Sequence, residues 1–311
     1  MFTARFKQLS KNDIALAGGK GASLGEMTQI GLSIPSGFVV LATAFDQFLE
    51  DTDLNVEIET ILKRVNPQEM ESVEKASEEI RSLIDNSKMS MNLQAEIIKE
   101  FKRLKTRFVA VRSSATAEDS KIASWAGELE TYLNVTKNNL IKSVIKCWSS
   151  LFTPRAIFYR FEKKLHKQKV SVAVVIQKMV QSEISGICFS VHPITKDKNQ
   201  MVIEAGFGLG EAIVGGQITP DTYVIHKNNF SVLDINVSEQ NIAIVRSGTG
   251  NSEKKLTPKQ GGKQKLSLKQ IIELAKICKG IEKHYKHPQD IEWAYAGGKF
   301  YITQSRPITT L

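Results

Sequence analysis

The stretch VSVAVVIQKMVQSEISGICFSVH, residues 170 to 192, decides how the chain is organised, because it holds two β-type runs in close succession. Apolar and β-branched residues fill both runs, and polar residues separate them. Further β-type runs follow at short intervals, namely MVIEA (201–205), TYVIH (222–226), FSVLDINV (230–237) and IAIVR (242–246). The sequence therefore predicts a β-rich second half.

The chain before this stretch has a different pattern. Residues 1–105 read as helical, and residues 106–180 mix β-type runs with helical segments. The expected helices lie near 43–50, 56–64, 68–84, 92–104, 136–152 and 154–164. We expect an α/β (α+β) fold of two lobes, 1–180 and 181–311, with a ligand cleft between their sheets.

The last part of the chain holds three expected features. Residues 247–267 are polar, basic and glycine-rich, which predicts an exposed or mobile connection. A helix over residues 268–285 and a terminal hairpin should follow.

Composition limits the functional classes. The chain has 311 residues and contains no uninterrupted apolar run of about 18 residues, so we expect a cytoplasmic protein that does not bind a membrane. Its three cysteines are widely spaced among apolar neighbours, as is typical of reduced core thiols. The formal charge of +9 fits an anionic partner, but no nucleic-acid recognition motif is present, and we expect no nucleic acid.

Two segments carry groups suited to phosphate. GGKGASLGEM (18–27) places Lys20 between glycines at the start of a helix, where N–H groups and the helix dipole favour anions. VRSSATAED (111–119) places Arg112 before small residues that allow a close backbone approach. Each pattern also fits a structural alternative: a glycine turn with a solvated lysine, or an arginine paired with a nearby acid.

Two further segments are candidate nucleotide contacts. Gln177, Lys178, Met179 and Val180 form the end of an apolar run, where backbone groups can meet an adenine edge, although a methionine in such a run is usually core. EAGFGLGEAIVGG (204–216) fails the dinucleotide-binding fingerprint. Its carboxylates, Glu204 and Glu211, fit ribose contacts or helix capping equally well.

The terminal hairpin DIEWAYAGGKFYITQSRP (290–307) presents candidate metal ligands. A two-residue Gly-Gly turn alone would send Glu292 and Gln304 to opposite faces, so we predict an odd loop, Ala296 to Gly298, with a bulge glycine. Glu292, Gln304 and Arg306 would then share one face. A carboxylate and an amide oxygen suit Mg²⁺, and Arg306 would neutralise phosphoryl charge.

These segments, in this order, resemble the N-terminal nucleotide-binding domain shared by phosphoenolpyruvate synthase, pyruvate phosphate dikinase and rifamycin phosphotransferase. The resemblance spans about Phe6 to Thr309 and is closest to phosphoenolpyruvate synthase through the motifs quoted above and SGICFSVHPIT (185–195). It implies that residues 1–311 form one ATP-grasp-like module. It also implies that Lys20, Arg112 and Arg306 contact ATP phosphates, Glu292 and Gln304 hold Mg²⁺, residues 177–180 bind adenine, and Glu211 contacts ribose.

The resemblance also implies that a partner is needed. Such enzymes pass the β-phosphoryl group of ATP to a histidine in a Gly-Gly-x-Thr-Ser-His signature, which residues 1–311 do not contain. We therefore expect a phosphohistidine domain or subunit and a pyruvate-binding domain or subunit elsewhere. The alternatives are the ATP lobe of a rifamycin phosphotransferase and a non-catalytic adenylate-binding module.

Two positions depart from the family pattern. His192 stands where relatives often have Asp or Asn, and Glu128 stands where they often have Gln. Any polar contact that the resemblance implies at these positions is therefore open.

Overall fold

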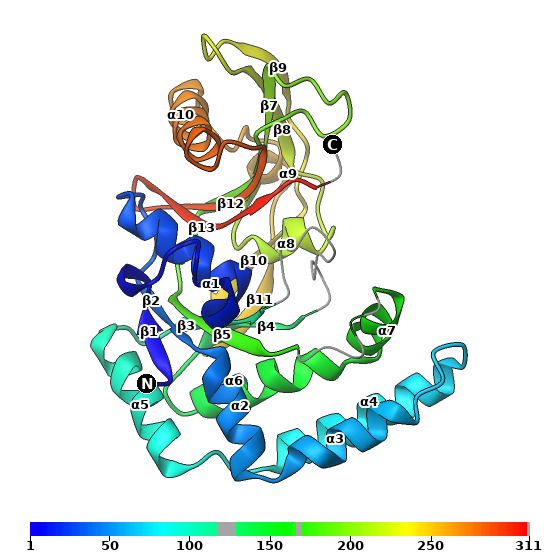
Figure 1. The fold of residues 1–311 in the computed structure, drawn as a ribbon. Coiled ribbons are helices and arrows are strands. Elements are labelled where there is room, and N and C mark those ends of the chain that lie inside the picture. The colour runs from blue at the N-terminus through cyan, green and yellow to red at the C-terminus, as the bar shows by residue number, and fades with distance from the viewer. Residues whose placement is uncertain (117–128, 164, 166–169, 310–311) are drawn as a thin grey trace. The chain divides into compact units, whose positions relative to one another are not determined.

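A computed structural model describes residues 1–116, 129–163, 165 and 170–309 (Figure 1). The chain divides into two compact units. The first comprises Met1–Gln29 with Ser36–Met179, and the second comprises Ile30–Pro35 with Val180–Leu311. Each unit has its own sheet and helices, so the predicted mixed α/β class is confirmed.

The first unit is built on a five-stranded antiparallel sheet in the order β1-β2-β5-β3-β4. The strands are β1 (Thr3–Arg5), β2 (Gly37–Val40), β3 (Val109–Ala115), β4 (Thr131–Val135) and β5 (Val172–Lys178). Strands β3 and β5 lie inside the sheet and are almost wholly buried, in keeping with the apolar residues that begin β3 and fill most of β5.

Helices cover both faces of this sheet. They are α1 (Ile14–Gln29), α2 (Ala42–Asp51), α3 (Leu54–Lys63), α4 (Met70–Asn86), α5 (Met91–Arg103), α6 (Leu140–Ser149) and α7 (Pro154–Glu162), with 3-10 turns η1 (Phe6–Gln8) and η2 (Ser150–Phe152). The core on the α2 and α6 side centres on Trp148, whose ring lies 5.7 Å from Phe45 and 5.0 Å from Phe48. Helix α7 begins where predicted, because Pro154 starts it and Thr153 accepts the N–H of Ala156 at 3.2 Å.

The second unit is built on a six-stranded antiparallel sheet in the order β13-β12-β6-β7-β8-β9. The strands are β6 (Ile184–Phe189), β7 (Gln200–Phe207), β8 (Asp221–His226), β9 (Val232–Asn236), β12 (Gln289–Ala296) and β13 (Lys299–Pro307). Helix α10 (Leu268–Tyr285), predicted over the same residues, buries Ile271, Leu274 and Cys278. Figure 1 shows it beside this sheet.

Residues 247–267 are largely exposed, as one of the two alternatives states, but they form regular elements instead of an irregular connection. This segment contains the last residue of β10 (Ile242–Ser247), all of its partner strand β11 (Gly250–Lys255), and helix α9 (Pro258–Gly261). Near the end of the segment, Lys265 Nζ lies 2.9 Å from Asp221 Oδ1, and both side chains are fully buried. Local composition does not predict this contact, because the ion pair joins residues far apart in the sequence.

Helix α8 (Glu211–Val214) completes the unit. Across the part of the chain that the structure describes, no helix combines the length and the apolar character needed to cross a membrane.

Candidate functional site

Helix α1 is interrupted at Gly18, and the interruption creates a helix start at Lys20. Gly18 has φ 65° and ψ 171°, so the regular helix begins after it. A Cβ on Gly18 would lie 2.2 Å from Ser114 Oγ and 2.4 Å from Ser114 O, so only glycine fits there. Ser114 Oγ donates to Ala17 O at 3.0 Å and accepts the N–H of Gly21 at 3.4 Å. Strand β3 thus holds this helix start, where the first N–H groups have no acceptor within the helix.

Arg112 lies on the same face of β3 as Ser114, because residues two apart in a strand share a face. It pairs with Thr131 on one side and Val175 on the other, and only 9% of its surface is exposed. Lys20 and Arg112 therefore belong to the same side of the first-unit sheet, as the phosphate interpretation requires.

The opposite face of β3 is sealed by a small polar cluster. Ser113 Oγ donates to Glu130 O at 2.9 Å and lies 3.0 Å from Ser150 Oγ. Burial, and to a lesser extent the charge of Glu130, raise the pKa of the Cys147 thiol to about 12, while Ser113 and Lys20 act in the opposite direction. Cys147 is therefore an inert core thiol.

The strand end at 177–180 differs in part from the expectation. Gln177 pairs with Ala110 on the face that carries Arg112. The N–H of Lys178 already donates to Ser36 O at 2.9 Å, and that of Met179 to Phe108 O at 3.2 Å. Neither N–H is available for adenine. In the described part of the chain, the N–H of Val180 has no such acceptor, so it remains as a backbone donor beside the Gln177 side chain.

The terminal hairpin closes with a two-residue turn, so the predicted odd loop is wrong. Ala296 pairs with Lys299, and Gly297 and Gly298 have φ values of 56° and 76°, as a type I′ turn requires. The extra residue lies further along β13, because Trp293 pairs with Ile302 but Glu292 pairs with Gln304.

This bulge at Thr303 restores the predicted face. Glu292 lies directly opposite Gln304, and Asp290 lies opposite Arg306 on the same face. The two glycines adopt the positive φ values that the short turn needs, and the bulge determines which side chains share a face.

Asp290 was not assigned a role from the sequence, although strand alternation already placed it with Glu292. Its Oδ2 accepts from Arg306 Nε at 2.8 Å and lies 2.7 Å from Arg306 Nη2, so it orients the guanidinium. Its Oδ1 is buried and, among the residues that the structure describes, has no hydrogen-bond partner. Burial raises the pKa of Asp290 and so does the nearby Glu292, whereas Arg306 lowers it.

Glu204 adds a further carboxylate to this face. It pairs with Ile187, which also pairs with Glu292, so the three side chains form one row across the sheet. Burial raises the pKa of Glu204, and the negative charge of Asp290 raises it further. Of the two roles left open for Glu204, helix capping is excluded, because the residue lies within β7.

Glu211 lies elsewhere in the second unit. It starts helix α8, and its Oε2 accepts from Asn251 Nδ2 of β11. Two positions depart from the family pattern. Glu128 lies outside the described residues, and His192 lies in the loop after β6.

His192 performs a turn role that Asp or Asn can also perform. Its Nδ1 accepts the N–H groups of Ile194 at 3.3 Å and Thr195 at 3.2 Å. Asp and Asn side chains accept N–H groups two and three residues onward in the same way. The departure at this position therefore preserves a loop contact.

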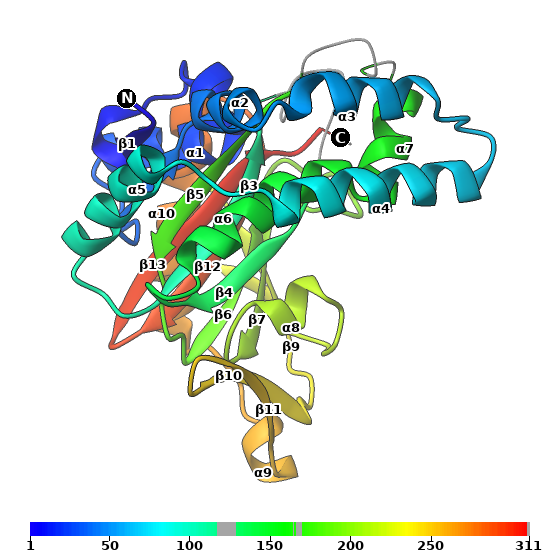
Figure 2. The ribbon, with the colours of Figure 1, turned by 90° about the horizontal axis from the view of Figure 1, so that it is seen from below.

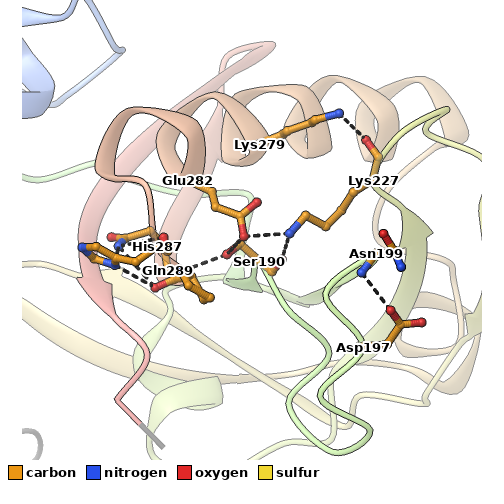
Figure 3. Close-up of polar contacts among 9 residues, drawn as sticks. Ser190, Asp197, Asn199, Lys227, Lys279, Glu282, His287 and Gln289 are labelled. Carbon is orange, nitrogen blue, oxygen red and sulfur yellow. Dashed lines mark hydrogen bonds and ion pairs between the residues drawn. The ribbon is translucent and has the colours of Figure 1, made fainter. Parts of the chain in front are cut away.

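A polar network behind β12 fixes the strand that carries Asp290 and Glu292 (Figure 3). Lys227 Nζ donates to Glu282 Oε1 and to Ser190 O, both at 2.7 Å. Ser190 Oγ donates to Glu282 at 3.1 Å and accepts the N–H of Gln289 at 2.8 Å. Gln289 Oε1 in turn accepts from Ser305 Oγ at 2.7 Å, between Gln304 and Arg306. The network links α10, β6, β8, β12 and β13.

The predicted site residues thus form two groups. Lys20, Arg112, Gln177, Lys178 and Met179 belong to the first unit, and Val180, Glu211, Glu292, Gln304 and Arg306 to the second. Within each unit the phosphate and metal candidates share a sheet face.

A comparison with protein families matches residues 14–311 to the pyruvate phosphate dikinase, AMP/ATP-binding domain. The chain belongs to this family of ATP-binding domains. The match covers both units, from α1 to the end of β13.

Relatives of this domain family carry it within longer proteins. The chain is 44% identical to a probable phosphoenolpyruvate synthase of Methanocaldococcus jannaschii, covering 100% of this chain and 27% of the relative. It is 44% identical to the corresponding protein of Archaeoglobus fulgidus (97% and 41%) and 38% identical to a rifampicin phosphotransferase of Bacillus cereus (100% and 36%). The chain spans less than half the length of these relatives.

The side chains of the second unit fit a divalent cation that is shared with a ligand. No group of three or more His, Cys, Asp or Glu side chains within the described ranges is placed to hold a metal alone. Glu292 and Gln304 nevertheless lie directly opposite each other and would each offer an oxygen ligand. Asp290 Oδ1, which has no hydrogen-bond partner in the described ranges, lies on the same face. Hard oxygen donors of this kind, few in number, suit Mg²⁺ bound together with phosphates.

Proposed function

We propose that this chain is the ATP-binding and phosphoryl-donating part of a phosphoenolpyruvate synthase. It passes the β-phosphoryl group of ATP to a histidine outside residues 1–311. The observation that carries the proposal is the hairpin face on which Glu292, Gln304 and an oriented Arg306 meet, in a domain of an ATP-binding family.

Each group has a part in the proposed site. Lys20 and the helix start after Gly18 bind phosphate oxygens, together with Arg112. Gln177 and the N–H of Val180 meet the adenine edge, and Met179 packs on its face. Glu211 is a candidate ribose contact. Glu292 and Gln304 would hold Mg²⁺, which neutralises phosphate charge and orients the triphosphate.

The reaction needs position and charge neutralisation more than covalent help from this chain. A histidine nitrogen attacks the β-phosphorus, the bond from that phosphorus to the α–β bridging oxygen breaks, and AMP departs with the electron pair. The histidine then carries the joined β- and γ-phosphoryl groups, and water cleaves the β–γ anhydride, so that phosphate leaves and the β-phosphoryl group stays on the histidine. Arg306 neutralises the charge that develops during this step, and Asp290 keeps its guanidinium in place.

The test combines the chain with the phosphohistidine domain of a phosphoenolpyruvate synthase, Mg²⁺ and ATP labelled at the β-phosphorus. Label should appear on the histidine, and added pyruvate should remove it. Lys20→Ala and Glu292→Ala should each abolish transfer. Lys254→Ala and Glu253→Ala serve as matched controls, because both residues are exposed on β11, and should leave transfer unchanged.

The outcomes separate the alternatives. Removal of the label by rifampicin instead of pyruvate would assign the chain to the phosphotransferase represented by the Bacillus cereus relative. ATP binding with no label on any histidine domain would contradict phosphoryl donation and favour an adenylate-binding module.

A further inference from the structure

The first unit contains a cavity of about 710 Å³ bounded by α2, α3, η2 and α7. Figure 2 shows α7 beside α3 and α4, at the end of this unit where the cavity lies. Its walls are largely apolar and buried: Phe45, Leu49, Ile58, Phe152, Ile157 and Val170. None of the residues proposed to bind ATP lines it. The cavity is therefore a separate feature of the fold.

One charged side chain of this lining is almost completely buried. Arg160 of α7 is only 7% exposed, and its guanidinium carbon lies 5.8 Å from the centre of the Phe152 ring. Burial lowers the pKa of Arg160 to about 10, so the group remains protonated at neutral pH. Within the described ranges, no carboxylate or carbonyl oxygen pairs with this guanidinium.

The acidic residues of the same lining are engaged elsewhere. Asp46 accepts from Ser171 Oγ at 3.0 Å. Glu59 lies 3.9 Å from Lys63, and both are exposed at the α3 rim. A buried cation without an anionic partner is unfavourable, and a bound anion would remove that cost.

We propose that this cavity binds a small molecule with an apolar body and a single anionic group, such as an aromatic or aliphatic carboxylate, whose anion pairs with Arg160. The volume lies within the usual range of small-molecule sites, and apolar walls with one placed polar group are their usual lining. A planar guanidinium can donate two parallel hydrogen bonds to a carboxylate or sulfonate.

The test uses two fluorescent probes of nearly the same shape. 8-Anilinonaphthalene-1-sulfonate carries an anion, and N-phenyl-1-naphthylamine has the same aromatic body without it. The anionic probe should bind the folded chain at one site. Arg160→Met keeps the side-chain length and should weaken binding of the anionic probe by about tenfold or more. The affinity for the neutral probe should change by no more than about twofold. Arg155→Met, on the exposed side of the same helix, is the matched control and should have no effect.

A second variant keeps the test decisive if Arg160→Met does not fold. Leu62 lies half-buried at the rim of the cavity on α3, so Leu62→Trp should fill the cavity and weaken binding of both probes. Unchanged binding of the anionic probe in a folded Arg160→Met or Leu62→Trp variant would overturn the proposal. Displacement of that probe by Mg²⁺ and ATP would overturn it as well, because the probe would then occupy the nucleotide site. Failure of phosphoryl transfer leaves these readouts unaffected.

Discussion

Individual carboxyl groups on the second-unit sheet face determine both its charge and its response to pH. Asp290 and Glu204 both have pKa values raised chiefly by burial. A carboxyl group with a raised pKa in the folded state contributes most to stability when protonated. That contribution is lost as the pH rises through the folded-state pKa. At neutral pH, the ionised carboxylates on the face that suits a cation therefore lower the free energy of unfolding.

Glu204→Gln should stabilise the chain at pH 7 in the absence of Mg²⁺. It removes a negative charge beside Asp290 and keeps the side-chain volume. The gain should be under about 1 kcal/mol, because Glu204 is only half-buried and solvent screens it. The difference from wild type should shrink as the pH falls and disappear below the ordinary glutamate pKa of 4.5. Urea unfolding at pH 7 and pH 4 measures it. Exposed Glu239 provides the control Glu239→Gln, and an equal gain there would contradict the explanation.

His192 should be replaceable by the residues that relatives often carry. His192→Asn preserves an acceptor for the N–H groups of Ile194 and Thr195, so the free energy of unfolding should stay close to that of wild type. His192→Ala leaves both N–H groups to solvent and should cost about 0.5–1 kcal/mol. Urea unfolding of the two variants compares them directly. Equal stabilities would show that the contact contributes nothing.

At the level of elements, α10 and the sheet of the second unit are joined by charge as well as by apolar packing. The Lys227–Glu282 pair has side chains 10% and 17% exposed, and Ser190 and Gln289 extend it to β6 and β12. This pair holds the strands that carry the metal candidates against their supporting helix.

A double-mutant cycle should reveal strong coupling in this pair. Lys227→Met or Glu282→Gln alone leaves the partner charge buried and should cost about 2–4 kcal/mol. The double variant should cost clearly less than the sum, with a coupling energy of about 1–3 kcal/mol. Urea unfolding followed by circular dichroism provides the four free energies. Additive costs would rule out direct coupling.

For the molecule as a whole, the question is whether both units contribute to one nucleotide site. The proposed function requires that Lys20 and Arg112 of one unit and Glu292, Gln304 and Arg306 of the other bind the same ATP. At about 100 times the dissociation constant, the bound nucleotide should stabilise the folded chain by about 2.7 kcal/mol.

Hydrogen exchange should show this joint binding. Mg²⁺ with ATP should slow amide exchange both at the helix start after Gly18 and along β13 from Gln304 to Arg306. Glu292→Ala should lose the protection in β13. Protection confined to a single unit would refute the shared site, even if ATP binds.

The elements that depend on local pattern could be predicted from the amino-acid sequence. The apolar period of α10, the Pro154 start of α7 and the β-type runs follow from side chains close in the chain, and so do the Lys20 and Arg112 motifs. Strand alternation also placed Asp290 with Glu292. These inferences need only the geometry of a helix or strand, which is fixed within a few residues.

Features that depend on contacts between distant residues could not be predicted in this way and emerge from the packed fold. Ser114 against Gly18 shapes the helix start, and the bulge at Thr303 brings Glu292 opposite Gln304. The buried Lys265–Asp221 pair anchors the end of the exposed segment 247–267, and Arg160 is buried among helices from separate parts of the chain. Burial and register arise when such segments pack together, so no local pattern specifies them.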